Sequence, residues 1–207
     1  MSRENYNDNV FINCPFDNEY QKKFHAIVYT ILRCGLIPHC ALEHDDASEN
    51  KIDKLYRLIA FCRFGVHDIS NTNLGTEDNL PRFNMPFELG VFLTAKRFGS
   101  REQKRKSILV FEKSSFLSKI YLSDLNGIDA KAHEDNYKVI IKHVRNWLIA
   151  SGVHKLPGHI ILEKEFSQFY EVFLPIILAQ SGLELHALSF NDYCSSLQEW
   201  LIQYTYI

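Results

Sequence analysis

The segment Asn9-Val10-Phe11-Ile12-Asn13-Cys14-Pro15-Phe16 decides the fold of this 207-residue chain. Its run of apolar residues, ended by Pro15, predicts a short buried strand. Apolar residues then recur at helical spacing from Phe24 to Leu32, with Asp17 as the expected N-cap and Gly35 as the residue that ends the helix. A buried strand followed by an amphipathic helix indicates the first unit of an α/β fold.

The same alternation continues along the chain. Further strands are predicted over Leu36–Leu42, Phe64–Ser70 and Lys106–Phe111, with one helix capped by Ser48 and another over Asn84–Phe98. Pro38 favours the edge of the sheet for the second strand, and a short fifth strand is expected within Leu122–Ala130. The alternation predicts a doubly wound parallel sheet of the flavodoxin-like type, with crossovers of the usual right hand.

Beyond residue 132 the pattern becomes helical. Apolar residues at helical spacing predict helices over Tyr137–Ile149, Phe166–Ala179 and Asp192–Gln203. We therefore divide the chain into an α/β domain, residues 1–132, and a C-terminal helical extension, residues 133–207, packed on it. The extension either covers the sheet or serves self-association.

Composition excludes several classes of function. A net charge of -2 argues against a nucleic-acid binder, and the basic segment Lys96–Lys106 is either a solvated loop or a rim that attracts phosphate. Neither the five cysteines nor the nine histidines show the spacing of metal ligands, so no metal and no cofactor are expected. A signal peptide and an apolar run of membrane-spanning length are both absent, which favours the cytoplasm and no membrane contact.

Ligands of doubly wound sheets bind beyond the carboxyl ends of the strands. The residues that follow the predicted strand ends are therefore candidates for substrate binding. The loop Asn71–Arg82 is long for a unit of this kind, which is typical of functional loops. The candidate binding residues are Asn13, Cys14, Pro15, Phe16, His67, Ser70, Arg82 and Asn84.

Two carboxylates are the candidates for catalysis. Glu88 lies between Phe87 and Leu89 in a helix with mostly apolar neighbours, and partial burial there would raise its pKa. The alternative is a solvated glutamate in the first turn, favoured by the helix dipole. Asp68 follows an apolar run and either caps a turn or belongs to the site. Because glycosidic cleavage uses paired carboxylates, we expect Asp68 and Glu88 to face a common cleft.

These residues carry a resemblance to a known family. The strand Val10–Phe16, Asp68 at the end of the third strand, and Glu88-Leu89-Gly90 resemble the nucleoside 2-deoxyribosyltransferase-like group, which is related to bacterial TIR domains. The resemblance covers residues 9–112. It implies that Glu88 is the nucleophile or the ribose-binding carboxylate, and that Asp68 contacts ribose or base. TIR-type relatives cleave NAD at the nicotinamide bond or build a signal from it, commonly in antiphage defence.

Two departures from that family concern the substrate. The transferases have a glycine-rich approach with a second aspartate, where this chain has Leu80–Pro86. Asn84 or Arg82 would replace that function, and Arg82 suits a phosphate or a dinucleotide better than a bare nucleoside. The first loop carries Cys14-Pro15-Phe16 in place of small residues, so the substrate need not be that of the transferases.

The resemblance implies an N-glycosidase that acts on NAD or a related nucleotide or nucleoside, with NAD as substrate and not as cofactor. Two alternatives remain open, a nucleotide-sensing module without turnover and a TIR-like module that acts by self-association. The expected partners are a nucleotide-type small molecule and a second copy of the chain; a membrane and nucleic acid are not expected.

Overall fold

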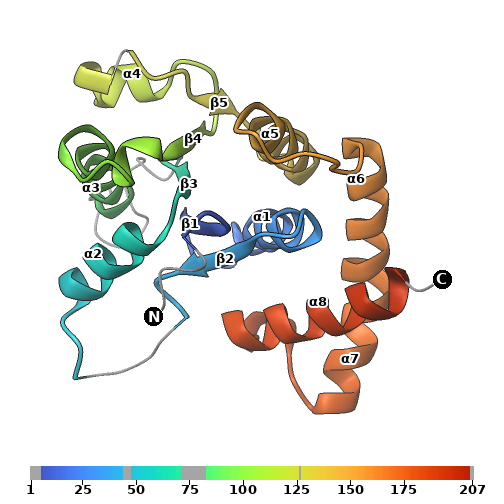
Figure 1. The fold of residues 1–207 in the computed structure, drawn as a ribbon. Coiled ribbons are helices and arrows are strands. Elements are labelled where there is room, and N and C mark those ends of the chain that lie inside the picture. Colours follow the sequence, from blue (N-terminus) through green and yellow to red (C-terminus); the bar gives the residue numbers. More distant parts are fainter. Residues whose placement is uncertain (1–5, 44–47, 71–82, 126, 206–207) are drawn as a thin grey trace.

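The chain folds around a five-stranded, all-parallel sheet (Figure 1), seen in a computed structural model that describes residues 6–43, 48–70, 83–125 and 127–205. The strand order β2-β1-β3-β4-β5 is that of the flavodoxin-like doubly wound sheets, so the predicted fold class is confirmed. The predicted loop 71–82 lies outside the described residues. The strands are β1 (Asn9–Asn13), β2 (Ile37–Cys40), β3 (Phe64–Asp68), β4 (Ser107–Glu112) and β5 (Lys131–Ala132).

Helices cover both faces of the sheet. Helices α1 and α5 lie over one face, and α2 and α3 lie over the other (Figure 1). A π-helical turn, Phe169–Phe173, joins α6 to α7. The helices are α1 (Gln21–Arg33), α2 (Lys51–Phe61), α3 (Asn84–Phe98), α4 (Ser118–Tyr121), α5 (Tyr137–Ala150), α6 (His159–Gln168), α7 (Leu174–Ser181) and α8 (Phe190–Thr205).

The alternation of side chains along each strand decides which face a residue serves. Val10, Ile12 and Val66 pack with α1 and α5, whereas Phe11 stacks on Phe92 of α3 at 6.3 Å between ring centroids. Both sets are apolar, as expected for a parallel sheet covered on both faces. The same alternation directs the last residue of β3, Asp68, toward the α1 and α5 side.

Four local predictions were wrong. The predicted helix Phe166–Ala179 begins earlier, at His159, and the π-helical turn divides it into α6 and α7. Tyr20 is the N-cap of α1, and Asp17 precedes it, accepting the Tyr20 N–H at 2.9 Å. Asn50 caps α2 in place of Ser48, because its side chain accepts the Ile52 N–H. The fifth strand is Lys131–Ala132, just after the predicted range, since Ile128 and Ala130 pack against the apolar cluster around Leu89 and Val110. The bounds of α3 and the edge position of β2 were predicted correctly.

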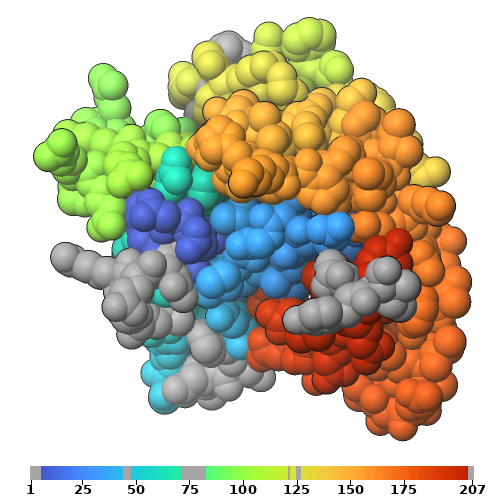
Figure 2. Space-filling view, turned by 45° about the vertical axis from the view of Figure 1, so that its right-hand side comes forward, coloured from blue at the N-terminus to red at the C-terminus, as the bar shows by residue number. Residues whose placement is uncertain are grey.

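Helix α1 is covered on more than one side. Every residue from Phe24 to Ile31 is buried, because the sheet lies beneath the helix and the C-terminal helices lie against its other sides. Figure 2 shows α1 in blue between the orange and red C-terminal helices. Glu165 of α6 accepts hydrogen bonds from Tyr29 Oη at 2.8 Å and Arg33 Nε at 2.8 Å. The predicted helical extension is therefore packed on α1.

The C-terminal helices share one continuous core with α1, α5 and the sheet. None of the helices in the described ranges is both long enough and apolar enough to cross a membrane. The predicted domain boundary between residues 132 and 133 stays a prediction. The sheet does end there, since β5 ends at Ala132, but the next helix, α5, packs on the sheet as part of the same core.

Candidate functional site

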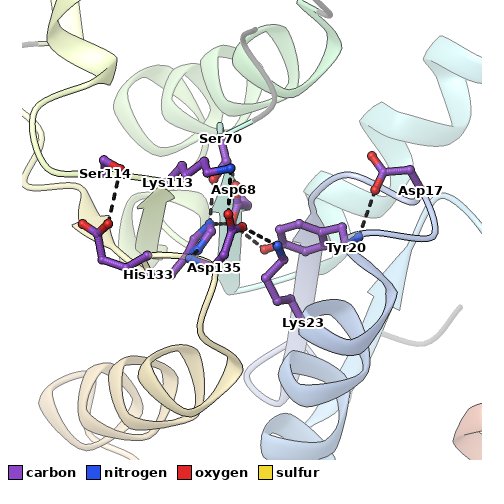
Figure 3. Close-up of polar contacts among 10 residues, drawn as sticks. Asp17, Tyr20, Lys23, Asp68, Ser70, Lys113, Ser114, His133 and Asp135 are labelled. Carbon is purple, nitrogen blue, oxygen red and sulfur yellow. Dashed lines mark hydrogen bonds and ion pairs between the residues drawn. The ribbon is translucent and has the colours of Figure 1, made fainter. Parts of the chain in front are cut away.

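An open polar pocket of about 120 Å³ lies at the carboxyl edge of the sheet. Two predicted residues line it, Pro15 after β1 and Ser70 after β3. Figure 3 shows how side chains from α1, β3 and the segments after β4 and β5 point toward one another here. The other lining residues are Asp17, Glu19, Tyr20, Lys23, Lys113 and Asp135.

Asp68 is buried next to this pocket and contacts two of its lining residues, Tyr20 and Ser70. Its Oδ2 accepts hydrogen bonds from Tyr20 Oη and from His133 Nε2, the latter at 3.1 Å, and its Oδ1 accepts the Ser70 N–H at 2.8 Å. Burial alone would raise the pKa of Asp68, but the hydrogen bonds from His133, Ser70 and Tyr20 outweigh it, and the net shift is downward. Asp68 is therefore an ionised, fully buried carboxylate that holds three elements together.

His133 is held in one tautomer. The Asp135 backbone N–H donates to its Nδ1 at 3.0 Å, so Nε2 is the ring nitrogen that donates. That single N–H faces both Asp68 Oδ2 and Ser70 Oγ, the latter at 2.7 Å. A serine nucleophile needs a histidine nitrogen that can accept its proton, with the carboxylate on the other nitrogen. This Asp–His–Ser cluster therefore positions the chain and does not form a hydrolytic triad.

Asp135 gathers two cations at the mouth of the pocket. Lys23 Nζ lies 2.6 Å from its Oδ1, and Lys113 Nζ lies 2.7 Å from its Oδ2. Hydrogen bonds from Lys113 and Lys23 lower the pKa of Asp135 to about 2. With Asp17 and Glu19 on the same wall, the pocket offers both acceptors and donors, which suits a ligand rich in hydroxyl groups.

Glu88 lies on the other side of the sheet, in the second turn of α3. Its side chain is half-buried, and burial raises its pKa to about 7. The start of α3 is fixed to the carboxyl edge because Asn13 Nδ2 donates to the Met85 carbonyl at 2.9 Å. Glu88 is thus a carboxyl group poised near neutral pH at the edge where doubly wound sheets bind ligands.

Asp68 and Glu88 reach the carboxyl edge of the sheet from opposite faces, and their common cleft stays a prediction. Asp68 points toward α1 and α5, whereas α3 covers the opposite face. Both carboxylates still lie near the end of β1, because both act on the buried thiol of Cys14. Burial raises the pKa of that thiol most, and the negative charges of Asp68 and, more weakly, Glu88 raise it further. Glu88 and the polar pocket therefore border the same edge from opposite faces.

The other predicted binding residues divide into buried and exposed ones. Asn13 and His67 are buried and contact each other, Nδ2 to Nδ1, at 3.1 Å, and burial lowers the pKa of His67 to about 3. Their part in binding stays a prediction. Phe16 and Asn84 are exposed at the carboxyl edge. Arg82 lies outside the described residues.

Sequence reasoning missed Tyr20, Lys23, Lys113, His133 and Asp135. A signal for two of them existed, since Lys113 and His133 directly follow β4 and β5 and obey the same strand-end rule as Ser70. Placing the fourth strand one residue early and the fifth strand before residue 131 hid them. Among the described residues, no group of three or more His, Cys, Asp or Glu side chains could hold a metal ion.

A scan against protein-family models finds no match for this chain, and a search of curated proteins finds none either. The geometry alone defines the class: a doubly wound α/β protein with a polar pocket and a half-buried glutamate at the carboxyl edge of its sheet.

Proposed function

We propose that the protein is an N-glycosidase-type enzyme that cleaves the bond between base and ribose in NAD or a related nucleotide or nucleoside. The observation that carries the proposal is Glu88, a half-buried carboxyl group at the sheet edge with a pKa of about 7. The resemblance of Glu88-Leu89-Gly90 to the nucleoside 2-deoxyribosyltransferase-like and TIR-like families supports the same role. On that resemblance we also propose a cytoplasmic role in antiphage defence.

In this proposal Glu88 is the catalytic carboxylate. As base and ribose separate, positive charge develops on the sugar, and an ionised carboxylate stabilises it or forms an ester with it. Asp68 is a positioning residue, because it is fully buried and bonded to Tyr20, Ser70 and His133. The polar pocket, with Ser70 and the Lys23–Asp135–Lys113 group, borders the same edge of the sheet and supports binding of polar groups of the nucleotide.

Incubation with substrates tests the proposal directly. Purified protein would be mixed with NAD, with several nucleoside monophosphates and with the matching nucleosides, and the released base would be followed by chromatography. Release of a free base in proportion to protein concentration supports the glycosidase. Absence of release from every compound at pH 8, where Glu88 is largely ionised, would reject it.

The pH profile of base release provides a prediction of its own. Glu88 must be ionised to stabilise positive charge, and its pKa is raised to about 7. We therefore expect kcat/KM to rise about tenfold per pH unit below about pH 7 and to level off above it, since this parameter reports the groups of the free enzyme. A rate that falls as the pH rises through 7 would make Glu88 a proton donor instead.

A nucleotide-sensing module without turnover is the second candidate. One observation favours it: Asp68, which was predicted as the second carboxylate of the pair, is fully buried and bonded to Tyr20, whereas most glycosidases use two carboxylates that both reach the substrate. The sensor predicts nucleotide binding that calorimetry detects while no base is released. The self-association alternative predicts instead that the molecular mass in solution rises with protein concentration.

A further inference from the structure

A second pocket lies between the first loop after β1 and the C-terminal helices. Its volume is about 100 Å³, several times the roughly 10–15 Å³ of accessible volume that a single water needs, so it has room for more than one water. Three distant stretches of chain build it: the first loop with α1, the turn after β2, and the segment that enters α8. Its lining is mixed: Phe16, Phe24, His25, Leu42, Leu188 and Phe190 supply aromatic and aliphatic surface, and Asp17, Asn18, Gln21 and His186 supply polar groups.

The aromatic residues form a wall that is open on one side. Phe24 packs edge-to-face against Phe16 at 5.2 Å between centroids and contacts Phe190 at 6.0 Å. Phe24 and Phe190 are buried, whereas the Phe16 side chain is 42% exposed. An exposed phenyl ring beside a pocket offers a surface on which a flat ligand ring can stack.

His25 is a lining residue that carries a polar atom without a hydrogen-bond partner in the described part of the chain. The residue is buried, and its Nδ1 has no hydrogen-bond partner among the described residues. The ring is fixed by stacking on Tyr193 at 3.9 Å, and burial lowers its pKa to about 3, so it is neutral near pH 7. A buried polar atom without a partner is costly, and a ligand with a complementary polar atom would remove that cost.

Two hydrogen bonds hold the C-terminal side of the pocket in place. Gln21 Nε2 donates to the Leu185 carbonyl at 2.7 Å, and Asn191 Nδ2 donates to the Glu43 carbonyl at 3.1 Å. The pocket therefore exists only because the C-terminal helices close over the first loop. It also borders the polar pocket, since Asp17 lines both.

We propose that this aromatic pocket binds the planar heteroaromatic ring of a nucleotide-type ligand, with Phe16 stacking on the ring and His25 as its polar partner. The inference takes the class of ligand from the proposed function and deepens it.

Binding measurements test this inference independently of turnover. AMP, nicotinamide mononucleotide and ribose 5-phosphate would be titrated calorimetrically into the wild-type protein, Phe16→Ala, His25→Phe and the control Phe98→Ala. Phe98 is 80% exposed at the C-terminal end of α3. Phe98→Ala therefore removes an exposed phenyl ring, as Phe16→Ala does, but away from the pocket. Thermal melting confirms that each variant is folded.

We expect one of the two nucleotides to bind the wild-type protein, with Kd at least about tenfold weaker in Phe16→Ala, as loss of a stacking ring implies. His25→Phe should weaken binding as well, and Phe98→Ala should leave it unchanged. Ribose 5-phosphate binding as tightly as the nucleotides, unchanged affinity in both pocket variants, or no binding of either nucleotide would overturn the inference. Ring binding that persists without base release would reject the glycosidase alone.

Discussion

Glu88→Gln should lower the rate of base release by a hundredfold or more. The amide keeps the shape of the side chain and removes the negative charge, so the substitution tests charge at the reacting centre. Losses of that order follow removal of an electrostatic or covalent contributor to catalysis. Initial rates of base release at saturating NAD, or at saturating concentration of whichever nucleotide proves to be the substrate, provide the measurement.

The same variant should fold at least as well as the wild-type protein. Burial raises the pKa of Glu88 to about 7, which means that the ionised form is less stable in the folded protein than in water. Above pH 7 a neutral glutamine removes that penalty. Glu199→Gln is the matched control, because Glu199 is an exposed glutamate on α8. A folded Glu88→Gln protein with undiminished base release would end the catalytic role of this residue.

Asp68→Asn should destabilise the fold by about 2–4 kcal/mol, since hydrogen bonds to buried charged groups are worth about 1.5–3 kcal/mol each. Tyr20 and His133 donate to Oδ2, and the Ser70 N–H donates to Oδ1. An asparagine has only one oxygen, so in either orientation its NH₂ group meets a donor. Urea denaturation of the two proteins gives the difference in the free energy of unfolding.

This loss should depend on pH in a defined direction. The folded-state pKa of Asp68 is lowered, so its contribution to stability is complete above the unfolded-state pKa of about 3.9 and is lost as the pH falls through the folded-state value. The gap between Asp68→Asn and the wild-type protein should therefore be widest near pH 6 and narrow below about pH 4. Asp124→Asn, at an exposed position, should show a small effect at every pH. An equally small effect of Asp68→Asn would contradict the buried network.

The fold was predictable because its determinants are local. The continuous apolar run of β1 indicates a strand that is buried on both faces. The helical spacing of apolar residues after it indicates a helix that is buried on one face, and both patterns can be read from a single sequence. The start of α3 at Asn84 was equally visible, because Pro86 suits a first helical turn. The half-burial of Glu88 followed from its apolar neighbours.

The polar pocket was not predictable in the same way. His133 lies 65 residues after Asp68 and Tyr20 lies 48 residues before it, and no spacing rule connects a tyrosine and a histidine over such distances. The choice of face depends on register: an aspartate one position earlier in β3 would point to the α3 side. The shared cleft of Asp68 and Glu88 rests on the strand-end rule, which specifies the edge of a sheet but not the face, and it stays a prediction.

Helix α1 has a consequence for how the chain tolerates change. A helix on the surface of a doubly wound sheet normally keeps one polar stripe, where substitutions are neutral. Here eight consecutive residues, Phe24 to Ile31, are buried between the sheet and the C-terminal helices. The segment least able to accept substitutions is thus a connecting helix, and the two layers it joins are expected to melt as one cooperative unit.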